Sequence, residues 1–223
     1  MKKFVIQSET ILTEGGFEKA LKQDIIAYYH DDYEGDGKWR EPDTIENLIC
    51  TFKNDIKPYP EKTMYDAIKK LAQILIVDLP KILSHSGKHN LRVCVVPRSK
   101  REKSYHPNQL YFRATIQLVT KKLKGFIDGT HDIIRHTDTA TTHLARSGHG
   151  GAGEMPYVGI TEDTCNISDD VIGQDILLID DLYTKTVNID EDCIQALLDK
   201  GAKSVIFYSI GKTLSKFEKK LWI

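Results

Sequence analysis

The sequence predicts an α/β fold in which a parallel sheet is flanked by helices. Short apolar runs rich in β-branched residues cover residues 91–96, 175–180 and 203–209, and stretches with helical spacing lie between them. Strands that alternate with helices imply right-handed crossovers and a parallel sheet that is buried on both faces. Ligands of such sheets bind beyond the carboxyl ends of the strands.

Three helices are predicted around this sheet. Apolar residues recur every three or four positions in residues 61–83, which indicates a helix that faces the core. Residues 109–123 repeat this spacing, and residues 189–200 form a third helix that Gly201 closes. Residues 61–223 are therefore expected to form a single core, as α/β folds of this length commonly do.

The first 60 residues are predicted to be an appendage to that core. Residues 16–30 have helical spacing, and residues 31–37 read as an acidic loop. Farther along, residues 125–155 contain few apolar side chains and many glycine, threonine and histidine residues, which predicts a long mobile loop before a strand at 156–160. Long loops in compact domains are usually functional or disordered.

Composition limits the classes of partner. The formal net charge is -1, so no global field favours nucleic acid or an anionic membrane, and direct nucleic-acid binding is not expected. The first six residues carry the charge of a signal peptide, but no long apolar region follows them. The four scattered cysteines form no CxxC pair. These features predict a soluble, reduced protein of the cytoplasm.

Histidines cluster in sequence at His131, His136 and His143. They have no fixed ligand spacing and no cysteine partner, so solvated loop histidines are preferred to a structural zinc site.

The strand predicted over residues 175–180 ends in a pair of carboxylates. A turn with two threonines and a lysine follows, and then a helix begins. Backbone amides and hydroxyls of such a turn can donate to a phosphate, while the carboxylates accept from ribose hydroxyls or from waters on Mg²⁺. Spacing alone supports equally well a strand end and a helix cap without a ligand. The residues concerned are Asp180, Asp181, Thr184, Lys185, Thr186 and Asn188.

Residues 176–188 resemble the phosphoribosyl pyrophosphate signature of the type I phosphoribosyltransferases, and residues 196–205 are similar to the helix, Gly-Ala turn and strand that follow it. By this resemblance, Asp180 and Asp181 match the ribose-binding acidic pair, and Thr184 matches the first hydroxyl of the phosphate loop. The match is incomplete at three positions. Relatives usually have a hydroxyl residue, a glycine and a threonine or serine where this chain has Lys185, Thr186 and Asn188.

A basic loop follows the first predicted strand of the core. Residues 95–101 resemble the pyrophosphate loop of the amidophosphoribosyltransferase-like and competence-associated branch of this family. The resemblance implies that Arg98, Lys100 and Arg101, with backbone amides around Ser99, neutralise a diphosphate leaving group. The alternative is a solvated basic turn, although a run of charged residues directly after a buried strand is less often without a function.

Residues 133–146 look like another stretch of that branch, in which a flexible loop closes over the reacting centre. The resemblance implies catalytic roles for Arg146 and His143, together with Arg101, and hinges at the glycines that follow. The composition of these residues is explained equally well by an ordinary loop without a catalytic role.

Taken over residues 60–213, the resemblance implies the type I phosphoribosyltransferase fold with an N-terminal hood. It also implies that the chain binds phosphoribosyl pyrophosphate, with Mg²⁺ held by the diphosphate and indirectly by Asp180 and Asp181. Cleavage would release pyrophosphate, with transfer to an unidentified acceptor or to water. The alternative is a non-catalytic sensor of a phosphoribosyl ligand, which the altered turn at Lys185 and Thr186 would permit.

The layout of a solitary domain with an altered signature is also similar to the toxin of certain anti-phage toxin–antitoxin pairs, whose partner resembles the DNA-processing protein DprA. Candidate protein partners are therefore such an antitoxin and a second copy of the chain.

Overall fold

The computed structural model describes residues 1–13, 16–35, 37–54, 59–139, 159–161, 163–185 and 188–214 of the chain. Its strands are β1 (Lys2–Ile6), β2 (Glu9–Thr13), β3 (Gly16–Leu21), β4 (Ile25–Tyr33), β5 (Leu91–Val95), β6 (Phe126–Asp128), β7 (Ile133–Arg135), β8 (Cys165–Ile167), β9 (Asp175–Tyr183) and β10 (Ser204–Thr213). Its α-helices are α1 (Ile45–Lys53), α2 (Glu61–Ser86), α3 (Tyr111–Thr120) and α5 (Ile189–Asp199), and its 3-10 helices are η1 (Lys38–Arg40), η2 (Glu102–Ser104), η3 (Pro107–Leu110) and η4 (Asp169–Val171).

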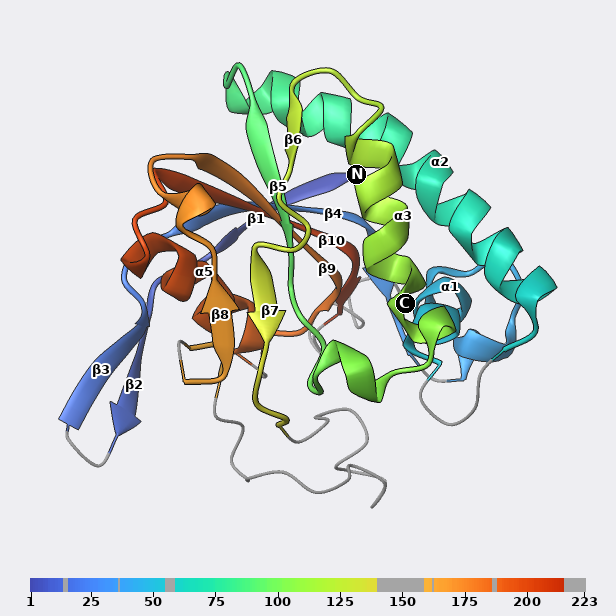
Figure 1. The fold of residues 1–223 in the computed structure, drawn as a ribbon, viewed down its shortest axis with the longest axis horizontal. Helices are drawn as coiled ribbons and strands as arrows, with labels where there is room; N and C mark the ends of the chain where they lie inside the picture. Colours follow the sequence, from blue (N-terminus) through green and yellow to red (C-terminus); the bar gives the residue numbers. More distant parts are fainter. Residues whose placement is uncertain are drawn as a thin grey trace.

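A six-stranded sheet with the order β1-β4-β10-β9-β5-β6 forms the centre of the molecule (Figure 1). All neighbouring strands are parallel except β1, which pairs antiparallel with β4 at one edge. The predicted α/β class, a mostly parallel sheet flanked by helices, is confirmed. The predicted strands at 91–96, 175–180 and 203–209 correspond to β5, β9 and β10.

Helices cover both faces of this sheet (Figure 1). Helices α1, α2 and α3 pack on one face, where the core includes Leu177 and Ile179 of β9. Helix α5 and the β7–β8 pair pack on the other face, where the core includes Ile176 and Leu178. Because successive side chains of a strand point to opposite faces, a strand buried on both sides is apolar throughout, which explains why β9 was recognisable from sequence.

Helix α2 confirms the helix predicted over residues 61–83. Its buried stripe includes Met64, Leu71, Leu75 and Leu79, which recur at helical spacing toward the sheet. The helix ends at Gly87, which has a φ of 65°. Glycine adopts this left-handed conformation without the steric cost that a side chain adds.

The prediction of a helix over residues 16–30 is wrong. The structure has two strands there, β3 and β4, and β4 lies in the main sheet between β1 and β10. In β4, Ala27 pairs with Phe207 of β10. The apolar positions of this segment fit a helix as well as a strand, and pairing with a strand far along the chain decides between them.

The sheet and its core extend across the boundary predicted at residue 60, which corrects the predicted N-terminal appendage. Strands β1 and β4 belong to the main sheet, and Leu48, Ile49 and Phe52 of α1 are buried in the core beneath α2. The β2–β3 ribbon, by contrast, extends away from the sheet (Figure 1).

The segment predicted as a loop from 125 to 155 contains two short strands. Strand β6 pairs with β5 at the sheet edge, and β7 pairs with β8 in a separate two-stranded sheet. Three-residue strands are too short to show a periodic pattern, so the sequence did not indicate them. The strand expected at 156–160 is not seen at Gly159 or Ile160, and its other positions lie outside the described residues.

All four cysteines are free. Cys94, Cys165 and Cys193 are buried, and burial raises the pKa of each thiol. A thiol with a raised pKa is a poor nucleophile, which argues against cysteine chemistry at these positions. Within the described part of the chain, no helix combines the length and the apolar character needed to cross a bilayer.

A buried carboxylate connects α2 to the sheet. Asp78 is 1% exposed, and its Oδ2 atom accepts a hydrogen bond of 2.9 Å from the Tyr208 hydroxyl and lies 2.8 Å from Nδ1 of His30. Burial raises the pKa of Asp78, but the hydrogen bonds from His30 and Tyr208 outweigh it, so the pKa lies below its ordinary value.

Replacing this carboxylate, as in Asp78→Asn, is expected to lower the free energy of unfolding by about 1–3 kcal/mol at neutral pH. A carboxyl with a lowered pKa stabilises the fold above its unfolded pKa, and this contribution is lost as the pH falls through the folded value. The difference between wild type and variant should therefore shrink below about pH 4. Urea unfolding across this range measures it, with the exposed Asp43→Asn as control; equal stability of Asp78→Asn and wild type at neutral pH would contradict the prediction.

Candidate active site at the carboxyl ends of β5 and β9

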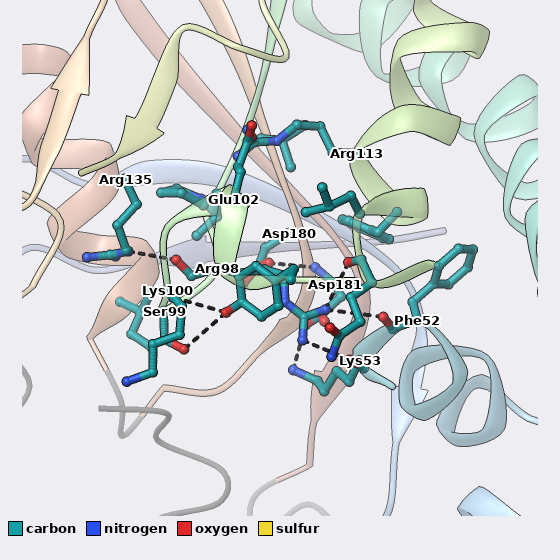
Figure 2. Close-up of a pocket in the computed structure, with 18 residues that line it drawn as sticks. Phe52, Lys53, Arg98, Ser99, Lys100, Glu102, Arg113, Arg135, Asp180 and Asp181 are labelled. Carbon is teal, nitrogen blue, oxygen red and sulfur yellow. Dashed lines mark hydrogen bonds and ion pairs between the residues drawn. The ribbon is translucent and has the colours of Figure 1, made fainter. Parts of the chain in front are cut away.

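A pocket of about 140 Å³ lies where β5 and β9 end (Figure 2). Because these two strands are hydrogen-bonded neighbours, the loop after β5 and the acidic pair of β9 meet at one edge of the sheet. The end of α1 and the segment from η2 to the start of α3 complete the walls. The polar residues that line it are Lys53, Arg98, Ser99, Lys100, Glu102, Tyr105, Gln109, Arg113, Arg135, Asp180 and Asp181.

The acidic pair, predicted to bind ribose, lies in this pocket beside a lysine that the sequence did not indicate. The Lys53 ammonium, at the end of α1, lies 3.1 Å from Oδ1 of Asp181, and the two side chains are 25% and 19% exposed. The Asp181 backbone N–H donates to Oδ1 of Asp180 at 2.8 Å. One carboxylate therefore has a cation beside it, while the other is held by backbone.

Protonation of the pair is shifted by its surroundings. Burial and then the charge of Asp181 raise the pKa of Asp180 to about 7, even though Lys53 opposes the shift. Asp190, 4% exposed in the first turn of α5, hydrogen-bonds Asp180, and burial followed by the charge of Asp180 raises its pKa well above the usual range. Both carboxyl groups are therefore harder to ionise than usual, because each is buried beside another negative charge.

The predicted phosphate turn lies beyond the pocket lining. The Thr184 hydroxyl is 2.8 Å from the hydroxyl of Thr213 at the end of β10, and the Lys185 side chain is exposed. Asn188 occupies the N-cap position of α5 with a φ of 58°, but its side chain makes no capping hydrogen bond. Thr186 lies outside the described residues.

The first turn of α5 carries three carboxylates of its own, Asp190, Glu191 and Asp192. Acidic side chains stabilise a helix N-terminus, and for the same reason they compete with any phosphate there. Glu191 accepts a hydrogen bond of 2.8 Å from the Tyr183 hydroxyl, which fixes it inside the protein. A phosphate at this turn would therefore depend on the threonines and Lys185 more than on the helix end.

Arg98, predicted to bind pyrophosphate, holds the protein backbone instead. Its guanidinium donates to the carbonyl oxygens of Lys53 at 2.7 Å, Phe52 at 3.2 Å and Gln109 at 3.1 Å. It also lies over the Tyr105 ring, 4.5 Å from the centroid. The carbonyls at the end of α1 have no helical partner, so Arg98 satisfies them and fixes the position of Lys53.

Ser99 and Lys100, which were predicted to bind pyrophosphate, both line the pocket. The Lys100 Nζ donates to the carbonyl oxygen of Thr139 at 2.7 Å, and its backbone N–H donates to the Tyr105 hydroxyl at 3.0 Å. The Ser99 hydroxyl lies 3.4 Å from the same Tyr105 hydroxyl. These bonds order the loop and keep it against the segment that follows β7.

Arg101 points away from the pocket. Its backbone N–H and its Nε donate to Oδ1 of Asp138 at 2.8 Å and 3.1 Å, and its side chain is 44% exposed. The structure thus does not bring Arg101 together with the acidic pair. The other two predicted catalytic residues, His143 and Arg146, lie outside the described residues.

Sequence reasoning missed Lys53, Arg113 and Arg135 as pocket residues. Lys53 lay within the predicted appendage, so no signal connected it to the acidic pair. Arg113 lies on α3 and forms an ion pair with Glu102, and nothing in the spacing of that helix distinguishes it from a surface residue. Arg135 stood inside the stretch at 133–146 that resembles the family, which was an available signal.

The described residues contain no group of three or more histidine, cysteine, aspartate or glutamate side chains arranged to hold a metal ion. Asp180 and Asp181 offer carboxylate oxygens, the donors that Mg²⁺ prefers, but the Lys53 ammonium already lies beside Asp181. This donor set fits an ion that is carried by a ligand, and it does not form a cage made by the protein alone.

No protein-family model matches the chain, and no curated protein matches it in sequence. Functional assignment therefore rests on the residues and the geometry of the pocket.

Proposed function

We propose that the chain binds 5-phosphoribosyl 1-pyrophosphate with Mg²⁺ in this pocket and cleaves it, releasing pyrophosphate. The ribosyl group is transferred to an acceptor or to water. The observation that carries the proposal is the meeting of the acidic pair with a basic loop at adjacent strand ends: Asp180 and Asp181 share the pocket with Ser99 and Lys100. The resemblance of both segments to the type I phosphoribosyltransferases supports the same assignment.

In this proposal, the carboxylates of Asp180 and Asp181 accept hydrogen bonds from the vicinal hydroxyls of the ribose. Lys100 and the backbone N–H groups around Ser99 take the negative charge that develops on the diphosphate as the anomeric bond lengthens. Thr184, Lys185 and Thr186 bind the 5-phosphate. No protein nucleophile is needed, because positioning and stabilisation of the separating charges supply the catalysis.

Asp180 and Asp181 would hold, through its waters, a Mg²⁺ ion that accompanies the diphosphate. When bound, the ion supplies neutralisation of the leaving group. Lys53 must then share Asp181 with the ligand, and the Arg98 contacts limit how far Lys53 can move.

The direct test is to incubate the purified chain with phosphoribosyl pyrophosphate and Mg²⁺ and to measure pyrophosphate release. We expect release by the wild type and a loss of at least about 100-fold in the double variant Asp180→Ala/Asp181→Ala, since two ligand-binding groups are removed. The exposed pair Asp66→Ala/Asp43→Ala serves as control for the change of charge.

Each outcome decides between the proposals. Tight binding of phosphoribosyl pyrophosphate without release of pyrophosphate would show that the chain is a sensor of this ligand and not an enzyme. Absence of both binding and release would reject the site altogether, as would release that the double variant retains.

A further inference from the structure

Arg135, the last residue of β7, is a buried cation without a counter-ion among the residues that the structure describes. It is 3% exposed, and its Nε donates to the Arg98 carbonyl oxygen at 2.6 Å. Its Nη1 has no hydrogen-bond partner, and among the described residues no carboxylate forms an ion pair with it. Burying an unpaired guanidinium is unfavourable, and unsatisfied buried polar groups are rare in folded proteins.

Two other cations of the pocket, Arg113 and Lys53, have a carboxylate beside them, unlike Arg135 within the described residues. Arg113 forms an ion pair with Glu102, and Lys53 lies 3.1 Å from Asp181. Carboxylates of the protein compensate these two charges, whereas no carboxylate in the described part of the chain compensates the charge of Arg135. An anionic ligand in the pocket would therefore compensate a charge on Arg135 that the described residues leave uncompensated.

The position of Arg135 gives that charge access to a ligand. Arg135 lines the same pocket as Ser99 and Lys100, and Figure 2 shows it beside this loop, joined to the Arg98 backbone. The Nε bond to the Arg98 carbonyl fixes one edge of the guanidinium, and Nη1 is buried without a hydrogen-bond partner among the described residues. Fixing the group beforehand reduces the entropy lost on binding.

We infer that Arg135 is an anion-binding residue of the pocket, and that its ligand is a phosphate or diphosphate group. The charge of the lining favours such a group over a single carboxylate, because the cations outnumber the carboxylates. The cations are Lys53, Arg98, Lys100, Arg113 and Arg135, and the carboxylates are Glu102, Asp180 and Asp181. A guanidinium donates two parallel hydrogen bonds to phosphate oxygens, which a lysine cannot do. In the proposed reaction, which this last step assumes, Arg135 holds the departing diphosphate.

Binding of inorganic pyrophosphate in the absence of divalent metal tests the inference without requiring turnover. Isothermal titration calorimetry should show binding by the wild type and an affinity lower by at least about 10-fold in Arg135→Met, since charge-assisted hydrogen bonds are lost. Arg135→Lys should lie between the two. The exposed Arg40→Met, which removes the same charge outside the pocket, should bind like the wild type.

Stability of the free protein separates a binding role from a structural one. Arg135→Met removes an uncompensated buried charge together with one backbone hydrogen bond, so thermal unfolding without anion should be unchanged or shifted upward. Added pyrophosphate should raise the melting temperature of the wild type but not that of Arg135→Met. Equal affinity of Arg135→Met and wild type overturns the inference, and so does the absence of pyrophosphate binding by the wild type.

The acidic pair distinguishes this inference from the proposed function. Asp180→Ala/Asp181→Ala should lose cleavage of the ribosyl substrate without any fall in the affinity for metal-free pyrophosphate, because the variant removes two carboxylates and no cation from the pocket. If the wild type binds pyrophosphate through Arg135 but neither binds nor cleaves phosphoribosyl pyrophosphate, the proposed function fails and the anion site remains. If cleavage occurs and Arg135→Met binds pyrophosphate normally, the anion site fails and the proposed function remains.

Discussion

Arg98→Met is expected to lower the free energy of unfolding by about 3–5 kcal/mol, the largest loss of stability among our predictions. The wild-type guanidinium donates to the carbonyl oxygens of Phe52, Lys53 and Gln109, and methionine leaves all three acceptors without this partner. Contact with the Tyr105 ring is also lost. Because Arg98 fixes the end of α1, the variant should release Lys53 from its place at the acidic pair.

Chemical unfolding measures this loss, and the same loop offers a matched control. Arg101→Met removes an exposed guanidinium whose partner is Asp138, so it should cost less than about 1 kcal/mol. Arg98→Lys should be intermediate, because one ammonium cannot span three carbonyls. A loss in Arg98→Met as small as that in Arg101→Met would show that Arg98 does not anchor α1.

Asp180→Asn is expected to give opposite changes in stability and activity. Pyrophosphate release should fall by about 100-fold or more, because the amide cannot replace the carboxylate as an acceptor for ribose hydroxyls. The free energy of unfolding above neutral pH should rise by about 1 kcal/mol, because burial and the charge of Asp181 disfavour the ionised form of Asp180. Functional carboxylates often carry such a cost to stability.

The pH dependence fixes the sign of this effect. Since the folded protein raises the pKa of Asp180 to about 7, the protonated form stabilises the fold below the unfolded pKa, and this stabilisation is lost as the pH rises to about 7. Relative to wild type, Asp180→Asn should therefore gain stability between about pH 4 and 7 and show a constant difference above that range. Asp66→Asn, on the exposed face of α2, should show neither change. A pH-independent difference would contradict the shifted pKa.

Sequence reasoning identified the elements whose pattern is local. Strands β5 and β9 contain short apolar runs, α2 has a long apolar stripe, and Asp180 and Asp181 directly follow the apolar run of β9, still within the strand. Each of these signals lies within about 20 neighbouring residues, where periodicity reports which face is buried. The rule that ligands of parallel sheets bind beyond the carboxyl ends of the strands indicated the edge at which the acidic pair and the loop after β5 lie.

The remaining features depend on contacts between distant segments. The same spacing in residues 16–30 fits a helix or a strand, and only the partner β10 makes β4 a strand. The direction in which a charged side chain points is also invisible in the sequence. Arg98 and Arg135 both read as basic residues of loops or short strands, yet one binds carbonyls of the protein and the other has a buried Nη1 without a partner.

The place of β4 in the sheet has a consequence for how the chain folds. Ala27 pairs with Phe207, so β4 stays without its parallel neighbour β10 until the long stretch of chain between them has been synthesised. Folding is slow when two strands so far apart in sequence must pair. Until they do, the exposed edge of an apolar strand favours aggregation. Yield of native protein should therefore depend on temperature and chaperones more strongly than the stability of the finished fold suggests.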